Sequence, residues 1–143
     1  MKPMIYGERI STPEILDSGC IDGYKYCILS LGSHPTAYIS LPPDSKVKSV
    51  VNDCKDDLCN IISVHGGWTF GPDRLSVLDT DDLYYGWDYA HCDDYIYYPK
   101  GLMEFPDMGL KKWTTEEVLD EVEHVIHELN GIEGRIQDYD EID

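Results

Sequence analysis

The sequence predicts an α+β domain in which a mainly antiparallel sheet is covered on one face by a C-terminal amphipathic helix. Three observations lead to this class. Two strand-like runs flank a short Gly/Pro turn, two further strand-like runs lie in the middle of the chain, and one long amphipathic segment lies near its end. A length of 143 residues fits a single domain spanning 1–143, and no internal repeat is visible.

The first strands are predicted after a weak N-terminal segment. Residues 4–6 could form a short edge strand, and residues 12–16 could begin a helical turn with proline at its first position. Residues 24–31 are rich in aromatic and β-branched side chains and are followed by a Gly/Pro turn at 32–35. Residues 36–41 then form a second strand-like run of the same composition. This pattern predicts a β-hairpin.

The middle of the chain gives shorter signals. Residues 45–51 predict a short helix, and the polar residues 52–57 predict a solvated loop. The apolar run 60–64 predicts a buried strand that ends directly before His65, and residues 84–90 predict the next strand.

The clearest element is the helix near the C-terminus. Thr114 and Glu117 fit a capping box at its start, and Asn130-Gly131 gives a stop signal. We expect the acidic residues 132–143 to form a flexible tail. The apolar residues of this helix fall on one face: Val118, Leu119, Val122, Val125, Ile126 and Leu129.

Composition restricts the function. Lys and Arg number 11 against 28 Asp and Glu, a formal net charge of -17. This charge repels phosphate backbones, so we expect no direct nucleic-acid binding; it suits a basic partner, a bound cation or simple solubility. The 5 cysteines lack a paired metal-type spacing, and we find neither an apolar run that could span a membrane nor a signal peptide. The predicted setting is a reducing cytoplasm.

A His-Gly-Gly turn and an Asp-x-x-His-x-x-Asp segment are the first candidate site. If the strands that carry them are neighbours, the two pieces meet at one end of the sheet. Two imidazoles and two carboxylates suit a divalent metal or a general acid/base pair. Alternatively, the histidines are structural and only hydrogen-bond loop carbonyls. The candidate ligand or metal site comprises His65, Gly66, Gly67, Asp88, His91 and Asp94.

Residues 79–98 are the second candidate site, because aspartates and aromatic residues alternate there without a lysine or arginine. Carboxylates among aromatic rings suit a basic protein surface whose arginines stack on the rings. Alternatively, the tyrosines fill the sheet face while the aspartates stay in water. The candidate binding residues are Asp79, Asp81, Asp82, Tyr84, Tyr85, Trp87, Asp93 and Tyr95.

Several motifs together resemble a family of small, mostly uncharacterised proteins from phages and prophages of Gram-positive bacteria. They are Gly-Tyr-x-Tyr with Leu-Gly-x-His-Pro and Ala-Tyr within 23–38, His-Gly-Gly-x-Thr at 65–69, Gly-x-Asp-x-Ala-His-x-x-Asp at 86–94, and Lys-Trp-Thr at 112–114. The resemblance implies a phage origin and a shared site, and no particular reaction.

From this resemblance and the charge we expect a phage-encoded, anti-CRISPR-like inhibitor that works in the host cytoplasm. It would bind a basic, nucleic-acid-handling surface of a host defence protein, such as a CRISPR effector, through its acidic and aromatic face. The alternative is a small metal- or nucleotide-dependent enzyme, or a ligand-binding protein, that uses the first candidate site. A phage structural or housekeeping protein is a third reading.

Overall fold

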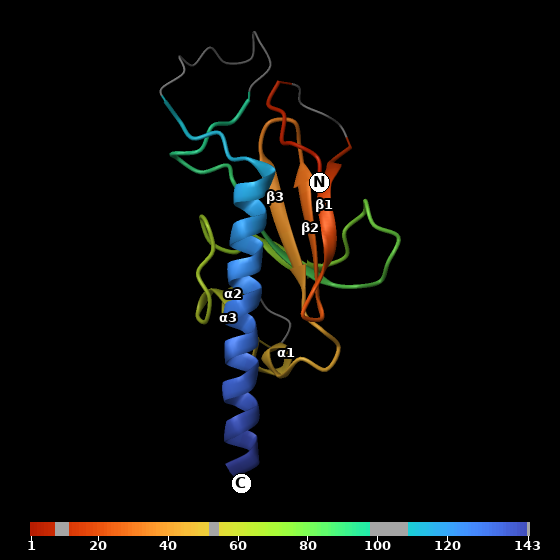
Figure 1. The fold of residues 1–143 in the computed structure, drawn as a ribbon, viewed down its shortest axis with the longest axis vertical. Helices are drawn as coiled ribbons and strands as arrows, with labels where there is room; N and C mark the ends of the chain where they lie inside the picture. The colour runs from red at the N-terminus through yellow and green to blue at the C-terminus, as the bar shows by residue number, and fades with distance from the viewer. Residues whose placement is uncertain (8–11, 52–54, 98–108, 143) are drawn as a thin grey trace.

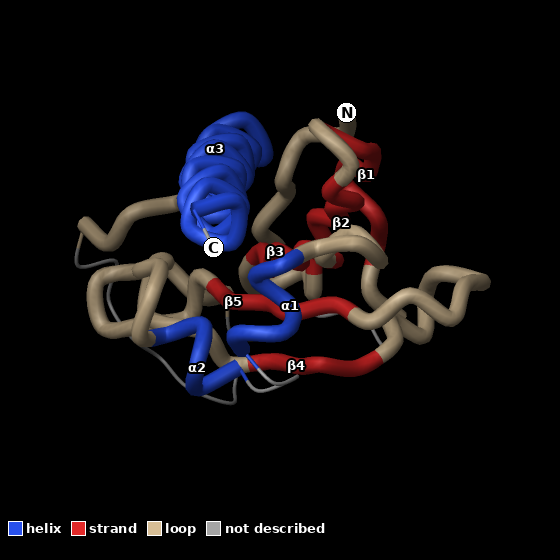
Figure 2. The backbone as a smooth tube through the Cα atoms, turned by 90° about the horizontal axis from the view of Figure 1, so that it is seen from below, coloured by secondary structure: helices blue, strands red, loops and turns tan. Residues whose placement is uncertain are grey.

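The computed structural model describes residues 1–7, 12–51, 55–97 and 109–142 (Figure 1). These residues form a five-stranded antiparallel sheet in the order β1-β2-β3-β5-β4, with a long C-terminal helix on one face, which confirms the predicted α+β class. Figure 2 shows the sheet curving around that helix. The elements are β1 (Glu14–Ile21), β2 (Tyr24–Ser30), β3 (Pro35–Ser40), α1 (Lys46–Val51), α2 (Lys55–Cys59), β4 (Phe70–Asp73), β5 (Tyr84–Asp88) and α3 (Thr115–Ile142).

The predicted hairpin of β2 and β3 is confirmed, and a second hairpin precedes it. Residues 12–16 do not begin a helix, because the edge strand β1 starts at Glu14 and pairs with β2. The turn between them is Asp22-Gly23, with φ of 52° and 86°, as a two-residue hairpin loop requires. The prediction failed because Thr-Pro-Glu looks like a helix start, whereas Leu16 is buried in the core beneath the sheet. Residues 4–6 form no strand in the described chain.

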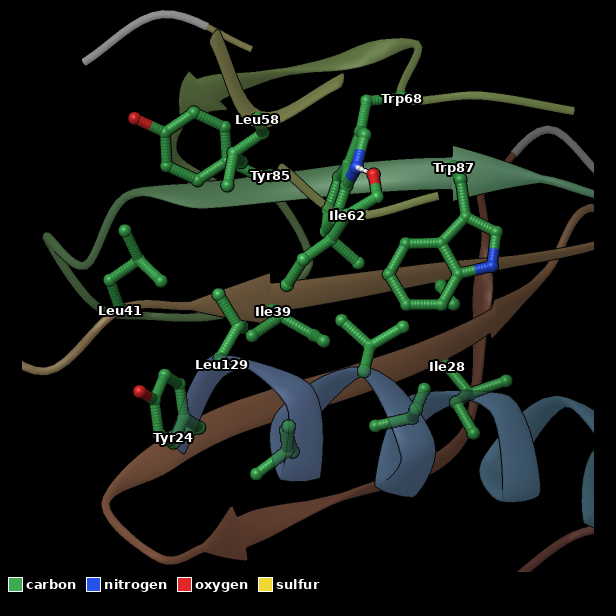
Figure 3. Packing of buried hydrophobic residues seen from close by; sticks show 14 of the residues in the cluster. Tyr24, Ile28, Ile39, Leu41, Leu58, Ile62, Trp68, Tyr85, Trp87 and Leu129 are labelled. Atoms are coloured by element: carbon green, nitrogen blue, oxygen red, sulfur yellow. Dashed lines mark hydrogen bonds between the residues drawn. The ribbon is translucent and has the colours of Figure 1, made fainter. Parts of the chain in front are cut away.

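Residues 60–64 do not form the expected strand. Ile62 is buried, but its carbonyl accepts a hydrogen bond of 3.0 Å from the indole N–H of Trp68 rather than from a neighbouring strand (Figure 3). The strand of this region is β4, which lies after the two glycines and pairs with β5. The predicted helix at 45–51 and the strand at 84–90 are confirmed as α1 and β5, whereas α2 lies where a loop was expected. Residues 52–54 of that expected loop are outside the described chain.

The start of α3 is confirmed and its predicted end is wrong. The Thr114 N–H donates to Glu117 Oε1 at 3.1 Å, and the Glu117 N–H donates to Thr114 Oγ1 at 3.2 Å. The helix then runs past Gly131 to Ile142 and extends beyond the sheet, where a flexible tail was expected (Figure 1). The reason is that Ile132 and Ile136 continue the apolar stripe and pack against the core, so tertiary packing outweighs the glycine.

Candidate functional site

The two pieces of the first candidate site meet at one end of the sheet. β4 and β5 are antiparallel neighbours, so the turn that precedes β4 lies beside the segment that follows β5. The Thr69 N–H donates to the Gly86 carbonyl at 2.9 Å and joins the two. The predicted juxtaposition therefore exists, although it depends on β4 and not on a strand at 60–64.

His65 forms a short contact with the buried carboxylate of Asp94. His65 Nε2 lies 2.7 Å from Asp94 Oδ2, and the Asp94 side chain is 2% exposed. Asp94 also accepts the backbone N–H of His91 at 3.0 Å and the indole N–H of Trp113 at 2.8 Å. Burial raises the pKa of Asp94, but the hydrogen bonds from His65, His91 and Trp113 outweigh it and hold the pKa below its usual range. The carboxylate is thus kept ionised inside the protein.

Glu121 of α3 fixes the other side of His65. Glu121 Oε2 accepts the His65 backbone N–H at 3.0 Å, while Oε1 accepts the Trp87 indole N–H at 3.0 Å and the Tyr89 hydroxyl. Burial and then Glu121 raise the pKa of Tyr89, so its hydroxyl keeps the proton that it donates. The His65 ring stacks on Tyr89 at 4.7 Å between centroids and meets the edge of Trp113 at 4.9 Å. This network holds the imidazole in one orientation.

His91 forms the second Asp–His pair and packs on the glycine turn. A Cβ at Gly66, where φ is +69°, would lie 1.9 Å from His91 Nε2, so only glycine fits beneath this ring. His91 Nε2 lies 3.1 Å from Asp88 Oδ1, a distance at which a protonated ring would form an ion pair. The same nitrogen makes no hydrogen bond to any described residue. Asp88 Oδ2 accepts the Thr69 hydroxyl at 3.1 Å. The rings of His65 and His91 lie 5.7 Å apart, and their side chains are 26% and 35% exposed.

The arrangement is two separate Asp–His pairs rather than one ligand set. In the part of the chain that the structure describes, no group of three or more His, Cys, Asp or Glu side chains could hold a metal ion. Asp94 already accepts three protein hydrogen bonds, from a ring, a backbone N–H and an indole. The geometry therefore gives the divalent-metal hypothesis no support, and it suits acid/base chemistry or hydrogen bonding to a small ligand.

The aromatic residues of the second candidate site are mostly buried. Tyr84, Tyr85 and Trp87 are each 3% exposed or less, so the prediction that they anchor a partner is wrong. All three lie on β5, a central strand covered on both faces, with Tyr85 and Trp87 toward α3 and Tyr84 toward the opposite cluster. Tyr95 is half-buried in the loop after β5 and packs edge-on against Tyr6.

The aspartates of that site separate into two groups. Asp79 and Asp81 are exposed in the loop before β5, where Asp82 bonds to Lys25 Nζ at 2.7 Å. Asp93 is exposed in the loop after β5. Because β5 lies between the two groups, the predicted acidic surface is not one continuous patch.

Two residues of the network were missed at the level of the sequence. Glu121 borders the buried stripe between Val118 and Val122 and points toward His65. Trp113 stands directly before the capping box, where an aromatic residue next to a helix start is a detectable signal.

No family model, no curated protein and no solved structure matches the chain. The resemblance to a phage family therefore stays a prediction. No helix in the described ranges combines the length and apolar character needed to cross a bilayer.

Proposed function

We propose that the chain is a phage-encoded, anti-CRISPR-like inhibitor that acts in the host cytoplasm. It binds a basic, nucleic-acid-handling surface of a host defence protein, such as a CRISPR effector, and competes with nucleic acid for that surface. The observation that carries the proposal is the net charge of -17, with 28 acidic residues against 11 basic ones. Such an excess steers a basic partner toward the protein over long range.

The distribution of exposed carboxylates supports this proposal. They come from both loops around β5 and from the outer side of α3, and examples are Asp79, Asp81, Asp93, Glu116, Asp120 and Glu123. Since the tyrosines and tryptophan of β5 are buried, charge rather than those aromatic residues is what a partner meets first.

The test is complex formation with a CRISPR effector nuclease as salt rises from about 0.1 M to about 1 M, which shortens the screening length from about 10 Å to about 3 Å. We expect affinity to fall steeply. Reversing Asp79 and Asp81 to lysine, or Asp93 and Glu116 to lysine, identifies the acidic group that faces the partner. The charge-matched controls exchange aspartate for glutamate at 79, 81 and 93, and glutamate for aspartate at 116. Binding that ignores both salt and both reversals contradicts the proposal.

The two Asp–His pairs favour a second candidate function, a small ligand-binding or acid/base site. Asp94 orients His65 through Nε2, which leaves Nδ1 of the neutral ring as the basic nitrogen. The carboxylates of Asp88, Asp94 and Glu121 beside the two histidines disfavour an anionic ligand such as a nucleotide and favour a neutral or cationic one.

Thermal melting tests this second function. The native protein is melted with divalent metal ions, nucleosides and polyamines, and a ligand of the site is expected to raise Tm. His65→Gln and His91→Gln should abolish that rise, whereas His124→Gln on the exposed side of α3 should not. A rise that all three variants retain places the ligand elsewhere, and no rise with any compound leaves the histidines structural.

A further inference from the structure

An ammonium group is held between an aromatic ring and a carboxylate at the start of α3. Lys111 Nζ lies 3.9 Å from the centroid of the Trp113 ring and 2.6 Å from Glu117 Oε2. A similar contact lies nearby, where Lys112 Nζ is 4.6 Å from the centroid of the Tyr95 ring. An aromatic face beside a carboxylate is the usual environment for recognising a cation.

The ring, the carboxylate and the Lys111 backbone are held by the fold, whereas the Lys111 side chain is half exposed. The Trp113 indole donates to buried Asp94, and the Trp113 carbonyl accepts the Tyr6 hydroxyl at 2.9 Å. Glu117 is fixed by the capping box, and its pKa is lowered first by Lys111 and also by the Thr114 N–H. The backbone N–H of Thr114 therefore helps to stabilise the ionised carboxylate of Glu117. The Lys111 side chain is 50% exposed, and an exposed pair of this kind is weak.

Trp113 is the tryptophan that a partner can reach. The chain has 3 tryptophans, and Trp68 and Trp87 are buried in the core. Trp113 is partly exposed. Exposed Asp93 lies beside its segment, because the Lys111 N–H donates to the Asp93 carbonyl, and exposed Glu116 follows Trp113 closely in the chain. Tryptophan offers the strongest aromatic face for a cation, so this end of the sheet joins charge to an accessible ring.

We propose that Trp113 and Glu117 receive an arginine side chain of the basic partner, and that Lys111 occupies this place until the partner binds. The inference rests on the proposed function, because it requires a basic partner. A guanidinium is planar, is less strongly hydrated than an ammonium, stacks on aromatic faces and can bond a carboxylate through two N–H groups. An arginine therefore gains more at this place than the lysine that it displaces.

The test uses a nona-arginine peptide and the full ¹⁵N-labelled chain at about 0.15 M salt. The indole N–H signals of the 3 tryptophans are followed by NMR, and Trp113→Phe assigns the relevant one. We expect the Trp113 signal to shift on peptide addition while those of Trp68 and Trp87 stay in place. Lys111→Ala should bind the peptide about threefold more tightly and Glu117→Gln about threefold more weakly.

Lys25→Ala is the matched control, because it also removes one lysine from an exposed ion pair, at the opposite end of the sheet. It should change peptide affinity less than Lys111→Ala does. Peptide binding that leaves the Trp113 signal unmoved, or that responds equally to both lysine variants, overturns this site and leaves the proposed function standing. No peptide binding at all counts against the proposed function and removes this inference with it.

Discussion

Asp94→Ala tests whether the His65 network is built as the structure shows. The substitution removes the acceptor of three hydrogen bonds, from the His65 ring, the His91 backbone N–H and the Trp113 indole. The His65 side chain is 26% exposed and can turn toward water, whereas the His91 backbone N–H and the indole of Trp113, which packs against the core, lose their acceptor. Removing one partner from a buried charged network costs roughly 3–5 kcal/mol, so we expect a loss in this range.

Urea unfolding followed by circular dichroism at pH 7 measures this loss. Asp93→Ala is the control, since it removes the same group one residue earlier, from an exposed position. Its effect on the free energy of unfolding should stay within about 0.5 kcal/mol. If the two variants differ by less than about 1 kcal/mol, Asp94 does not hold the site together and the reasoning fails.

The same variant has an expected dependence on pH. The folded-state pKa of Asp94 is lowered below the unfolded value of about 3.9, so the unfolded chain binds the proton more readily. The stabilisation is therefore fully present above about pH 4 and is lost as pH falls through the folded-state pKa. The stability gap between the native protein and Asp94→Ala should be widest at neutral pH and should narrow in acid; a gap that widens in acid would refute the assigned direction.

Three further predictions concern other positions, each measured by urea unfolding. Gly66→Ala should cost at least about 1 kcal/mol more than Gly67→Ala, because both introduce strain at positive φ but only the first meets an imidazole ring; equal costs would contradict the packing. Glu133→Ala should cost about 1 kcal/mol by uncapping α1, whose first N–H groups donate to Glu133. Glu128→Ala, at a side chain that is 41% exposed, should cost less; the reverse order would count against the cap. Trp87→Ala should cost about 3–5 kcal/mol as a core cavity, and a loss of partner binding without a loss of stability would restore it as an interface residue.

Local signals predicted the elements whose partners lie close in the chain. The β2–β3 hairpin and the capped start of α3 follow from turn chemistry and from a hydroxyl and a carboxylate three residues apart. The prediction of where α3 ends was wrong because the stop signal at Gly131 competes with the packing of Ile132 and Ile136 against the hydrophobic core. That packing depends on residues far away in the sequence. The register of β4 beside β5 is also a long-range property, and a four-residue strand containing glycine and proline carries little signal of its own.

The candidate site was predicted in its residues but not in its chemistry. The glycine-flanked His65 and the segment from Asp88 to Asp94 do lie together, as strand adjacency suggested. What the pattern did not show is that each carboxylate faces a different imidazole, nor that Glu121 enters the network from α3. The pairing of carboxylates with imidazoles depends on side-chain direction across the sheet, and the position of Glu121 depends on the depth at which the helix packs. The aromatic residues of β5 were misplaced for a similar reason, since a run rich in tyrosine suits an interface and a two-sided core equally well.

The two proposed functions make different demands on charge, and this separates them. Docking through surface carboxylates depends on the sum of many screened interactions, so no single neutral substitution at the sheet end should abolish it. A ligand or acid/base site depends on individual imidazoles, one hydrogen-bonded to Asp94 and the other beside Asp88. His65→Gln and His91→Gln leave the formal net charge at -17 with histidine counted as neutral, and so leave long-range attraction intact while removing the basic nitrogens. Folded variants that still bind a basic partner but no longer respond to a small ligand would show that the protein has both a docking surface and a separate ligand site. Loss of partner binding would instead make the histidines part of the docking surface.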